Sequence, residues 1–230
     1  DPEGLTYNLE EFARQGLGGV EITPIYGVKG NETNDISYLS PKWMNMLGHT
    51  IAEGKRLGLQ IDMNNGTGWP FGGPEVTAAQ SARKRVAESW TVSPGKKLKI
   101  TVRPSDRKQQ GVATLQRIIA VNGDRRIDIT SHLRRDSLLD WKAPKAKSDW
   151  KVYAIFSGRT FQKVKRAAPG GEGLVVNHYD SIAVNSYLDR FDRAFASSGI
   201  PYPDSFFNDS YEGYGSDWAD NIFEEFERDH

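Results

Sequence analysis

Acidic, amide and hydroxyl side chains crowd one short segment near the end of the chain, Phe207-Asn208-Asp209-Ser210-Tyr211-Glu212. The segment follows a predicted strand. Hydrolysis of a glycosidic bond needs one carboxylic acid to protonate the leaving oxygen and a second carboxylate to activate water or to attack. Glu212 is a candidate for one member of such a pair. The alternative is that Asp209 or Ser210 caps a following helix and that Glu212 is solvated.

A loop rich in glycine and proline follows a second predicted strand, from Asn64 through Trp69 to Pro74. Its composition indicates a rigid loop with unusual backbone angles, which either contacts a ligand or closes the top of the strand. A dinucleotide-binding loop is excluded because its third glycine would fall at Phe71 and because Pro70 lacks an amide donor. No Gly-Lys-Ser/Thr sequence follows, which argues against an ATP-type phosphate loop.

Other polar residues lie within predicted strands. Glu21 is surrounded by Gly, Val and Ile, so it faces either a ligand or an ion-pair partner. Asp62 and Asn64 alternate along the next strand and therefore share one face. They are expected to point into the mouth of a barrel, unless Asp62 anchors a neighbouring loop.

The sequence does not support several other kinds of metal binding or catalysis. The chain has no cysteine and no Gly-x-Ser-x-Gly sequence, so it offers no thiolate metal site and no serine nucleophile elbow. The four histidines show no metal-ligand spacing and are expected to be structural or exposed. Oxygen-rich spots such as residues 208–210 could hold Ca²⁺, but no EF-hand pattern supports this.

Helices and strands alternate on both sides of the middle of the chain. Helices are expected from Leu5 to Ala13, from Ser40-Pro41 to a stop at Gly58, from Ile182 to Gly199, and from Trp218 to Phe226. Strands are expected at 18–22, 59–64 and 205–208. This rhythm is typical of a parallel sheet with crossover helices. Three strands cannot close a barrel, so the chain is either a small open sheet or an excised part of a (β/α)₈ barrel. We favour the excised barrel part.

The middle of the chain differs from the rest in net charge and in the periodicity of its apolar residues. Between Arg83 and Arg166 there are 22 Lys and Arg against 7 Asp and Glu, so this segment carries +15 and the remainder −15. Short β-rich runs occur at 90–92, 98–102, 115–121, 127–129 and 150–156, with an Asn122-Gly123 turn signal. We therefore predict a barrel part at 1–87, a basic antiparallel β-rich insertion at 88–166, and a truncated continuation of the barrel at 167–230.

Four stretches of the chain resemble the glycoside hydrolase family 106 α-L-rhamnosidases, in the order that the family has them. They are Gly16–Glu21, the loop Gly66–Pro74, residues 165–173 (Lys-Arg-Ala-Ala-Pro-Gly-Gly-Glu-Gly) and residues 207–212. The glycine–tryptophan–proline loop is the most specific of them. The resemblance implies a (β/α)₈ barrel with a β-sandwich-like insertion, inside a larger multidomain enzyme that removes terminal rhamnose with inversion and is associated with calcium.

Residue roles follow from this resemblance. Glu212 corresponds to a catalytic carboxylate, supported by Asp209. The residues implied to line the sugar pocket are Glu21, Asn64, Trp69, Ser210 and Tyr211. The expected partners are a rhamnose-containing glycan and the remaining domains of the parent chain, and the expected location is periplasmic or extracellular.

Two other functions stay open at the sequence level. One is a related barrel that binds glycans without cleaving them. The other is binding of a polyanion or nucleic acid through the basic insertion, which would require affinity to fall steeply with salt. No nucleic-acid motif is present, and the basic residues are dispersed among strands, so no nucleic-acid partner is expected. No apolar run approaches the ~18 residues of a membrane helix, and no leader resembling a signal peptide is present.

Overall fold

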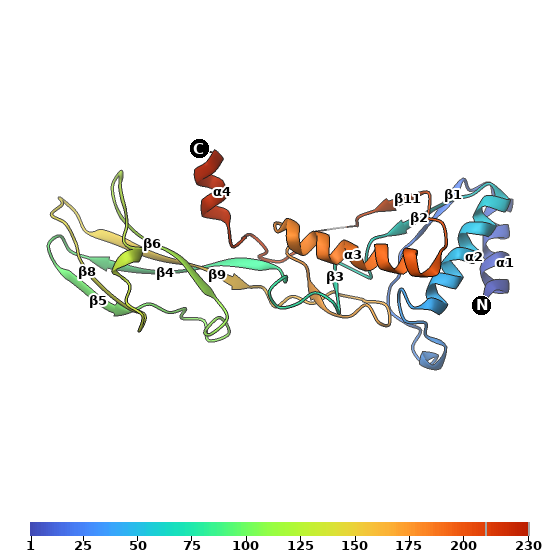
Figure 1. Ribbon diagram of the computed structural model, residues 1–230, viewed down its shortest axis with the longest axis horizontal. Coiled ribbons are helices and arrows are strands. Elements are labelled where there is room, and N and C mark those ends of the chain that lie inside the picture. The colour runs from blue at the N-terminus through green and yellow to red at the C-terminus, as the bar shows by residue number, and fades with distance from the viewer. Residues whose placement is uncertain (210, 230) are drawn as a thin grey trace. The chain divides into compact units, whose positions relative to one another are not determined.

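The computed structural model describes residues 1–209 and 211–229 (Figure 1). The chain forms two compact units. We call Asp1–Ala82 with Phe161–Tyr214 the α/β unit, and Arg83–Thr160 with Gly215–His230 the β unit. The domain bounds predicted at residues 88 and 166 stay a prediction. The fold class is mixed α/β, with one parallel sheet and several antiparallel ones among the described residues.

The α/β unit contains a three-stranded parallel sheet in the order β1-β2-β11, formed by β1 (Gly19–Ile22), β2 (Gln60–Asn64) and β11 (Ser205–Phe207). Three α-helices accompany it, namely α1 (Pro2–Arg14), α2 (Pro41–Leu57) and α3 (Ser181–Ser198). A single 3₁₀ turn, η1 (Glu32–Asn34), lies between β1 and α2. The helices and strands predicted from the sequence for this unit are confirmed.

The ends of these helices lie where local side-chain chemistry predicts them. Ser40 Oγ accepts a hydrogen bond from Trp43 N at 3.3 Å and so caps the start of α2. Gly58 and Gly199 follow α2 and α3 in the left-handed conformation, with φ of 71° and 67°. Asp180, which caps α3, accepts from Ile182 N at 2.9 Å.

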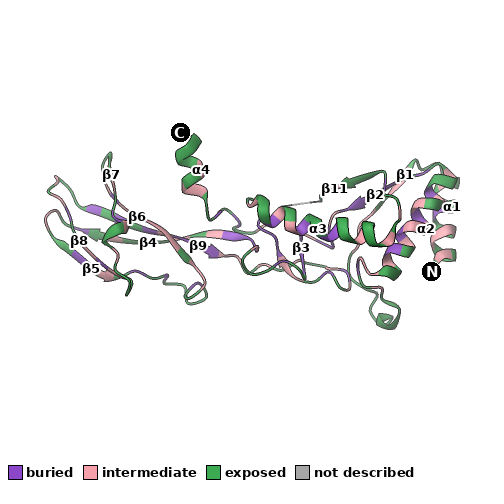
Figure 2. Cartoon of the chain, in the orientation of Figure 1, coloured by how far each residue is buried: buried purple, intermediate pink, exposed green. Residues whose placement is uncertain are grey.

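The two faces of the parallel sheet differ in polarity. Ile61 and Met63, on one face of β2, are 1% and 0% exposed and pack in apolar clusters with side chains of the helices. Most of β2 is coloured as buried in Figure 2. The opposite face carries Glu21, Asp62 and Ser205, which share one register position across the three strands. Hydrogen bonds from the side chains of Gln60 and Ser205 hold the pKa of Asp62 below its ordinary value. This face is therefore polar and anionic.

Two antiparallel sheets enclose the core of the β unit. The four-stranded sheet has the order β4-β9-β6-β7, from β4 (Arg83–Val92), β9 (Trp150–Arg159), β6 (Thr114–Asn122) and β7 (Arg125–Asp128). The second sheet pairs β5 (Lys97–Thr101) with β8 (Leu138–Lys142), and a 3₁₀ turn, η2 (Thr130–His132), follows β7. The antiparallel sheets expected in the middle of the chain are confirmed, including the turn between β6 and β7, where Gly123 has φ of 56°.

Three details differ from the sequence-based expectation. β4 begins at Arg83 instead of Trp90, because the residues before Trp90 are mostly charged or small and carry little apolar signal. β8 was not predicted, since only Leu139 and Trp141 of its five residues are buried. Trp218 was expected in the last helix, but that helix, α4 (Ile222–Asp229), starts later, because Trp218 forms an antiparallel bridge with Arg83.

Acidic residues of the segment 215–229 contact basic residues within the β unit. Asp220 forms an ion pair with Arg83 at 2.9 Å, and Glu227 pairs with Arg117. Asp217 Oδ1 accepts a hydrogen bond from the backbone N of Arg85 at 2.8 Å. The positive charge of the β unit is thus partly balanced within the unit itself. Separately, none of the helices among the described residues has the length and apolar character that crossing a membrane requires.

Candidate active site

Three loops leave the carboxyl ends of the parallel strands, after Ile22, Asn64 and Phe207. In parallel α/β sheets this edge is where ligands bind, because the loops that follow the strands meet there. The residues that the sequence singled out lie on these strands and loops, and all of them belong to the α/β unit. Ser210 lies outside the described residues.

Glu212 lies in the loop after β11, and a single amide side chain anchors the backbone around it. Gln162 Nε2 donates to the Glu212 carbonyl oxygen at 2.7 Å, and Gln162 Oε1 accepts from Tyr214 N at 2.9 Å. These two bonds act like one rung of a β-ladder between segments about fifty residues apart in sequence. The backbone of the half-buried Glu212 is therefore held in a defined position.

The Glu212 carboxylate is also linked to a cation. Tyr214 Oη donates to Glu212 Oε2 at 3.4 Å, and Lys165 Nζ donates to the same Tyr214 oxygen at 3.4 Å. Lys165 Nζ lies 4.5 Å from the centre of the Tyr214 ring as well. Both hydrogen bonds are long and therefore weak, so they affect the orientation of the three groups more than the energy that holds them together. Hydrogen bonds thus connect the Glu212 carboxylate, the Tyr214 phenol and the Lys165 ammonium group in series.

Tyr211 joins the β11 loop to the glycine loop through aromatic contacts. Its ring centre lies 5.9 Å from Phe71 and 5.3 Å from His178, and its hydroxyl accepts from Asn208 Nδ2 at 2.9 Å. Burial lowers the pKa of His178, which favours its neutral form. Tyr211 is 59% exposed, so the ring offers a free face of the kind that stacks on sugars. Asp209 is exposed.

The glycine loop packs closely against the segment 163–175. Trp69 N donates to Lys165 O at 3.2 Å, Lys165 N donates back to Trp69 O at 2.9 Å, and the Arg166 guanidinium lies 5.2 Å from the Trp69 ring. A Cβ on Gly68 would lie 1.9 Å from Lys165 O, and one on Gly72 would lie 2.1 Å from Leu174 O. These glycines are thus required by backbone packing, including the two-residue pairing of β3 (Gly72–Gly73) with β10 (Leu174–Val175).

Gly68→Ala tests this packing. Gly68 has φ of +57°, so alanine would suffer both a left-handed backbone and a clash with the Lys165 carbonyl. We expect a loss of more than about 2 kcal/mol in the free energy of unfolding, measured by urea denaturation. Gly16→Ala is the matched control, because Gly16 has φ of +81° but no atom within 4 Å of the added Cβ. Equal losses in the two variants would contradict the role of close packing.

Asn64 and Glu21 lie on the polar side of the sheet, but they differ in environment. Asn64 is fully buried, and neither its Nδ2 nor its Oδ1 has a hydrogen-bond partner among the described residues. A buried amide without a partner is costly, which marks this position as one where a further polar group belongs. Glu21 is exposed and accepts only from Thr23 Oγ1 at 3.3 Å. No described contact joins Glu21 to Glu212 or Trp69.

Sequence reasoning missed several residues that hold the site together, namely Gln162, Lys165, Arg166, His178 and Tyr214. Lys165 and Arg166 belong to a stretch that carries the family resemblance, and His178 stands out by its neighbours, but neither signal assigns a role. Arg166 adopts the left-handed conformation with φ of 57°, and its carbonyl accepts from Tyr26 N at 3.0 Å. Gln162 has no local sequence signal, because its partners lie about fifty residues away.

Across residues 1–209 and 211–229, no group of three or more His, Cys, Asp or Glu side chains is placed to hold a metal ion. The calcium that the family resemblance implies therefore has no acidic cluster here that fits it, and we assign no step of the chemistry to it.

The class of protein is shown by similarity to a known family. The family model described as alpha-L-rhamnosidase matches residues 1–112 and 101–230. Its matches together extend over the whole chain. The rhamnosidase from Novosphingobium sp. PP1Y has a similar structure, with a TM-score of 0.67 at 15% identity over 99% of this chain. The chain therefore belongs to glycoside hydrolase family 106, as the sequence motifs predicted.

A second relative carries a different name. A protein from Formosa agariphila described as "Putative beta-glucuronidase" is 23% identical over 224 residues, covering 81% of this chain. The chain spans 19% of that protein and 39% of the Novosphingobium rhamnosidase. It therefore corresponds to part of proteins that are much longer.

Proposed function

We propose that the enzyme to which this chain belongs removes terminal α-L-rhamnose from a polysaccharide or glycoside, with inversion and by acid/base catalysis. The family membership supports a rhamnose-containing glycan as substrate. The observation that carries the proposal is the position of Glu212, half-buried after a parallel strand and held by the paired hydrogen bonds to Gln162. A carboxylate at this edge of the sheet, carried on a backbone that is held in place, suits proton transfer to or from a bound sugar.

Each predicted residue receives a role in this proposal. Glu212 is a catalytic carboxylate and Asp209 is the second acidic candidate. Asn64, Trp69, Ser210, Tyr211 and Glu21 bind the substrate: the unpaired Asn64 amide suits a sugar hydroxyl, and the exposed Tyr211 ring suits the sugar face. An inverting pair is about 6.5–9.5 Å apart, so the partner of Glu212 can also come from the rest of the enzyme.

The wider architecture is part of the same proposal. The three parallel strands are a section of a (β/α)₈ barrel, and the β unit is inserted into it. The polar face with Glu21 and Asp62 then faces the barrel interior, while the apolar face packs on the helices. The family resemblance alone supports two further expectations, namely calcium binding elsewhere in the enzyme and a periplasmic or extracellular location.

A barrel that binds glycans without cleaving them is the main alternative, and a different sugar specificity is another. The relative named as a glucuronidase makes a β-D-glucuronide a necessary second substrate in any test. Binding of a polyanion through the β unit is a third, separable possibility, because it predicts affinity that falls steeply as salt rises.

The deciding experiment compares this 230-residue chain with a protein extended at both ends, using an aryl α-L-rhamnoside and an aryl β-D-glucuronide. We expect the longer protein alone to release a sugar, and that sugar to be rhamnose. Release from the glucuronide only would replace the substrate. A folded longer protein that binds rhamnosides and releases nothing would establish the binding function instead.

A further inference from the structure

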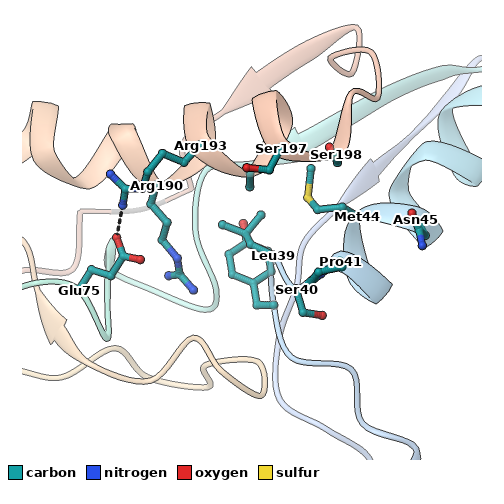
Figure 3. Close-up of a pocket in the computed structure, with 12 residues that line it drawn as sticks. Leu39, Ser40, Pro41, Met44, Asn45, Glu75, Arg190, Arg193, Ser197 and Ser198 are labelled. Carbon is teal, nitrogen blue, oxygen red and sulfur yellow. Dashed lines mark hydrogen bonds and ion pairs between the residues drawn. The ribbon is translucent and has the colours of Figure 1, made fainter.

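A pocket of about 540 Å³ lies in the α/β unit between the start of α2 and the second half of α3 (Figure 3). One wall is formed by residues 38–41 with Met44 and Asn45, and the other by α3 from Arg190 to Ser198, with Glu75 at the side. None of the residues assigned to rhamnoside cleavage lines it. Its volume falls within the range of about 300–1,000 Å³ typical of small-molecule sites.

Arg190 is the unusual group in this pocket. It is 9% exposed, and its guanidinium donates one hydrogen bond, from Nη2 to the Gly170 carbonyl at 3.0 Å. Nε and Nη1 have no acceptor among the described residues, and no described carboxylate lies within ion-pair distance of Arg190. Buried charges in proteins are normally paired, so Arg190 lines this pocket as a cation with spare donors and no counter-ion among the described residues.

The neighbouring Arg193 shows the ordinary arrangement. Its Nη2 forms an ion pair with Glu75 Oε2 at 2.6 Å, and its side chain is 61% exposed (Figure 3). Glu75 is thus occupied by Arg193 at the rim, which leaves Arg190 as the cation inside. The two arginines lie on one helix and provide a matched pair for experiment.

The chemistry of the walls indicates what binds beside Arg190. A guanidinium presents parallel N–H groups that match the two oxygens of a carboxylate. The Tyr38 ring, whose centre lies 5.3 Å from the Arg190 guanidinium, and the side chains of Leu39 and Met44 supply apolar surface. Asn45 and Ser197 are exposed and line the same pocket, so they can meet hydroxyl groups. A carboxylate, a ring and several hydroxyls together describe an acidic sugar.

We propose that this pocket binds a uronic acid, with its carboxylate held by Arg190. The site is separate from the strand-end residues around Glu212, so it would recognise an acidic sugar of a glycan and not the bond that is cleaved. Uronic acid binding is measured without turnover. A failure of this proposal can therefore be distinguished from a failure of the proposed rhamnosidase activity.

The test is calorimetric titration of the 230-residue chain with D-glucuronate and D-galacturonate, with D-glucose, D-galactose and acetate as comparisons. We expect saturable binding of at least one uronate, at least about ten-fold tighter than acetate and the neutral sugars, because one hydrogen-bonded charged pair is worth about 1.5–3 kcal/mol. Equal binding of a neutral sugar would overturn the role of Arg190. Equal binding of acetate would overturn recognition of a sugar, and no binding would overturn both.

Variants assign the binding to the pocket. Arg190→Met should lower uronate affinity at least about ten-fold, while Arg193→Met, which removes a cation already paired with Glu75, should leave it unchanged. Because Arg190 also holds the Gly170 carbonyl, Arg190→Met could unfold the unit. Ser197→Trp is the second variant for that case, since it places a bulky ring in the pocket from an exposed position and keeps the Arg190 side chain. Uronate binding that survives Ser197→Trp, or that is lost equally in Arg193→Met, would refute the site.

Discussion

Replacing Glu212 by glutamine should lower kcat of the whole enzyme toward an aryl α-L-rhamnoside on the order of 10²- to 10⁴-fold, because positioned acid/base groups contribute that much. Glutamine keeps the size of the side chain and can still accept a hydrogen bond from Tyr214, but it cannot transfer a proton. The Gln162 contacts involve the backbone, so the loop should keep its position. KM should therefore change much less than kcat.

Two further variants make this result interpretable. Glu172→Gln removes an exposed carboxylate from the same unit and should leave kcat unchanged. Asp209→Asn tests the second candidate carboxylate by itself. A loss of kcat similar to that of Glu212→Gln would mean that both carboxylates take part in the reaction. Full turnover by a correctly folded Glu212→Gln enzyme would remove Glu212 from the mechanism.

Replacing Trp150 by alanine should cost about 3–5 kcal/mol in the free energy of unfolding of the β unit. Trp150 is 0% exposed, and its ring meets Trp141 edge to face with centres 5.8 Å apart. Its Nε1 donates to the Pro144 carbonyl at 3.1 Å, and the Arg125 guanidinium lies 5.0 Å from the ring. Alanine would leave a large cavity between the two sheets and also an unpaired carbonyl.

Tyr153→Ala is the matched control, because Tyr153 lies on the same strand but points away from the core and is 39% exposed. Its loss should stay within about 1 kcal/mol. Both variants are followed by far-UV circular dichroism in urea, so that the tryptophan replaced is not itself the probe. A Trp150→Ala protein as stable as Tyr153→Ala would mean that the two sheets do not depend on a common core.

Gln162 illustrates why the candidate site could only partly be predicted. The sequence marks the carboxylates at 209 and 212 because their type and their place after a strand can be seen locally. Gln162 looks like any polar residue between strands, yet its side chain holds the backbone at Glu212 and at Tyr214. Lys165 reaches the same carboxylate only through Tyr214. Such contacts join distant segments, so no local pattern encodes them.

The sequence by itself determined the elements whose ends depend on neighbouring residues. Ser40 with Pro41 starts α2, Gly58 ends it, and Asn122-Gly123 turns β6 into β7, because caps and turns are satisfied within a few residues. The period-two and helical apolar patterns likewise separate the β-rich middle from the flanking helices and strands. The family motifs added the membership in glycoside hydrolase family 106.

Only the tertiary structure decided which distant segments meet. It pairs β3 with β10, brings the backbone of Gly68 against the Lys165 carbonyl, and joins Asp220 to Arg83. It also leaves Arg190 buried in the wall of a pocket with no carboxylate paired to it among the described residues, although its sequence neighbourhood resembles that of the paired Arg193. The physical reason is that burial and partner choice depend on how the whole chain closes, whereas caps, turns and periodicity depend on a few adjacent residues.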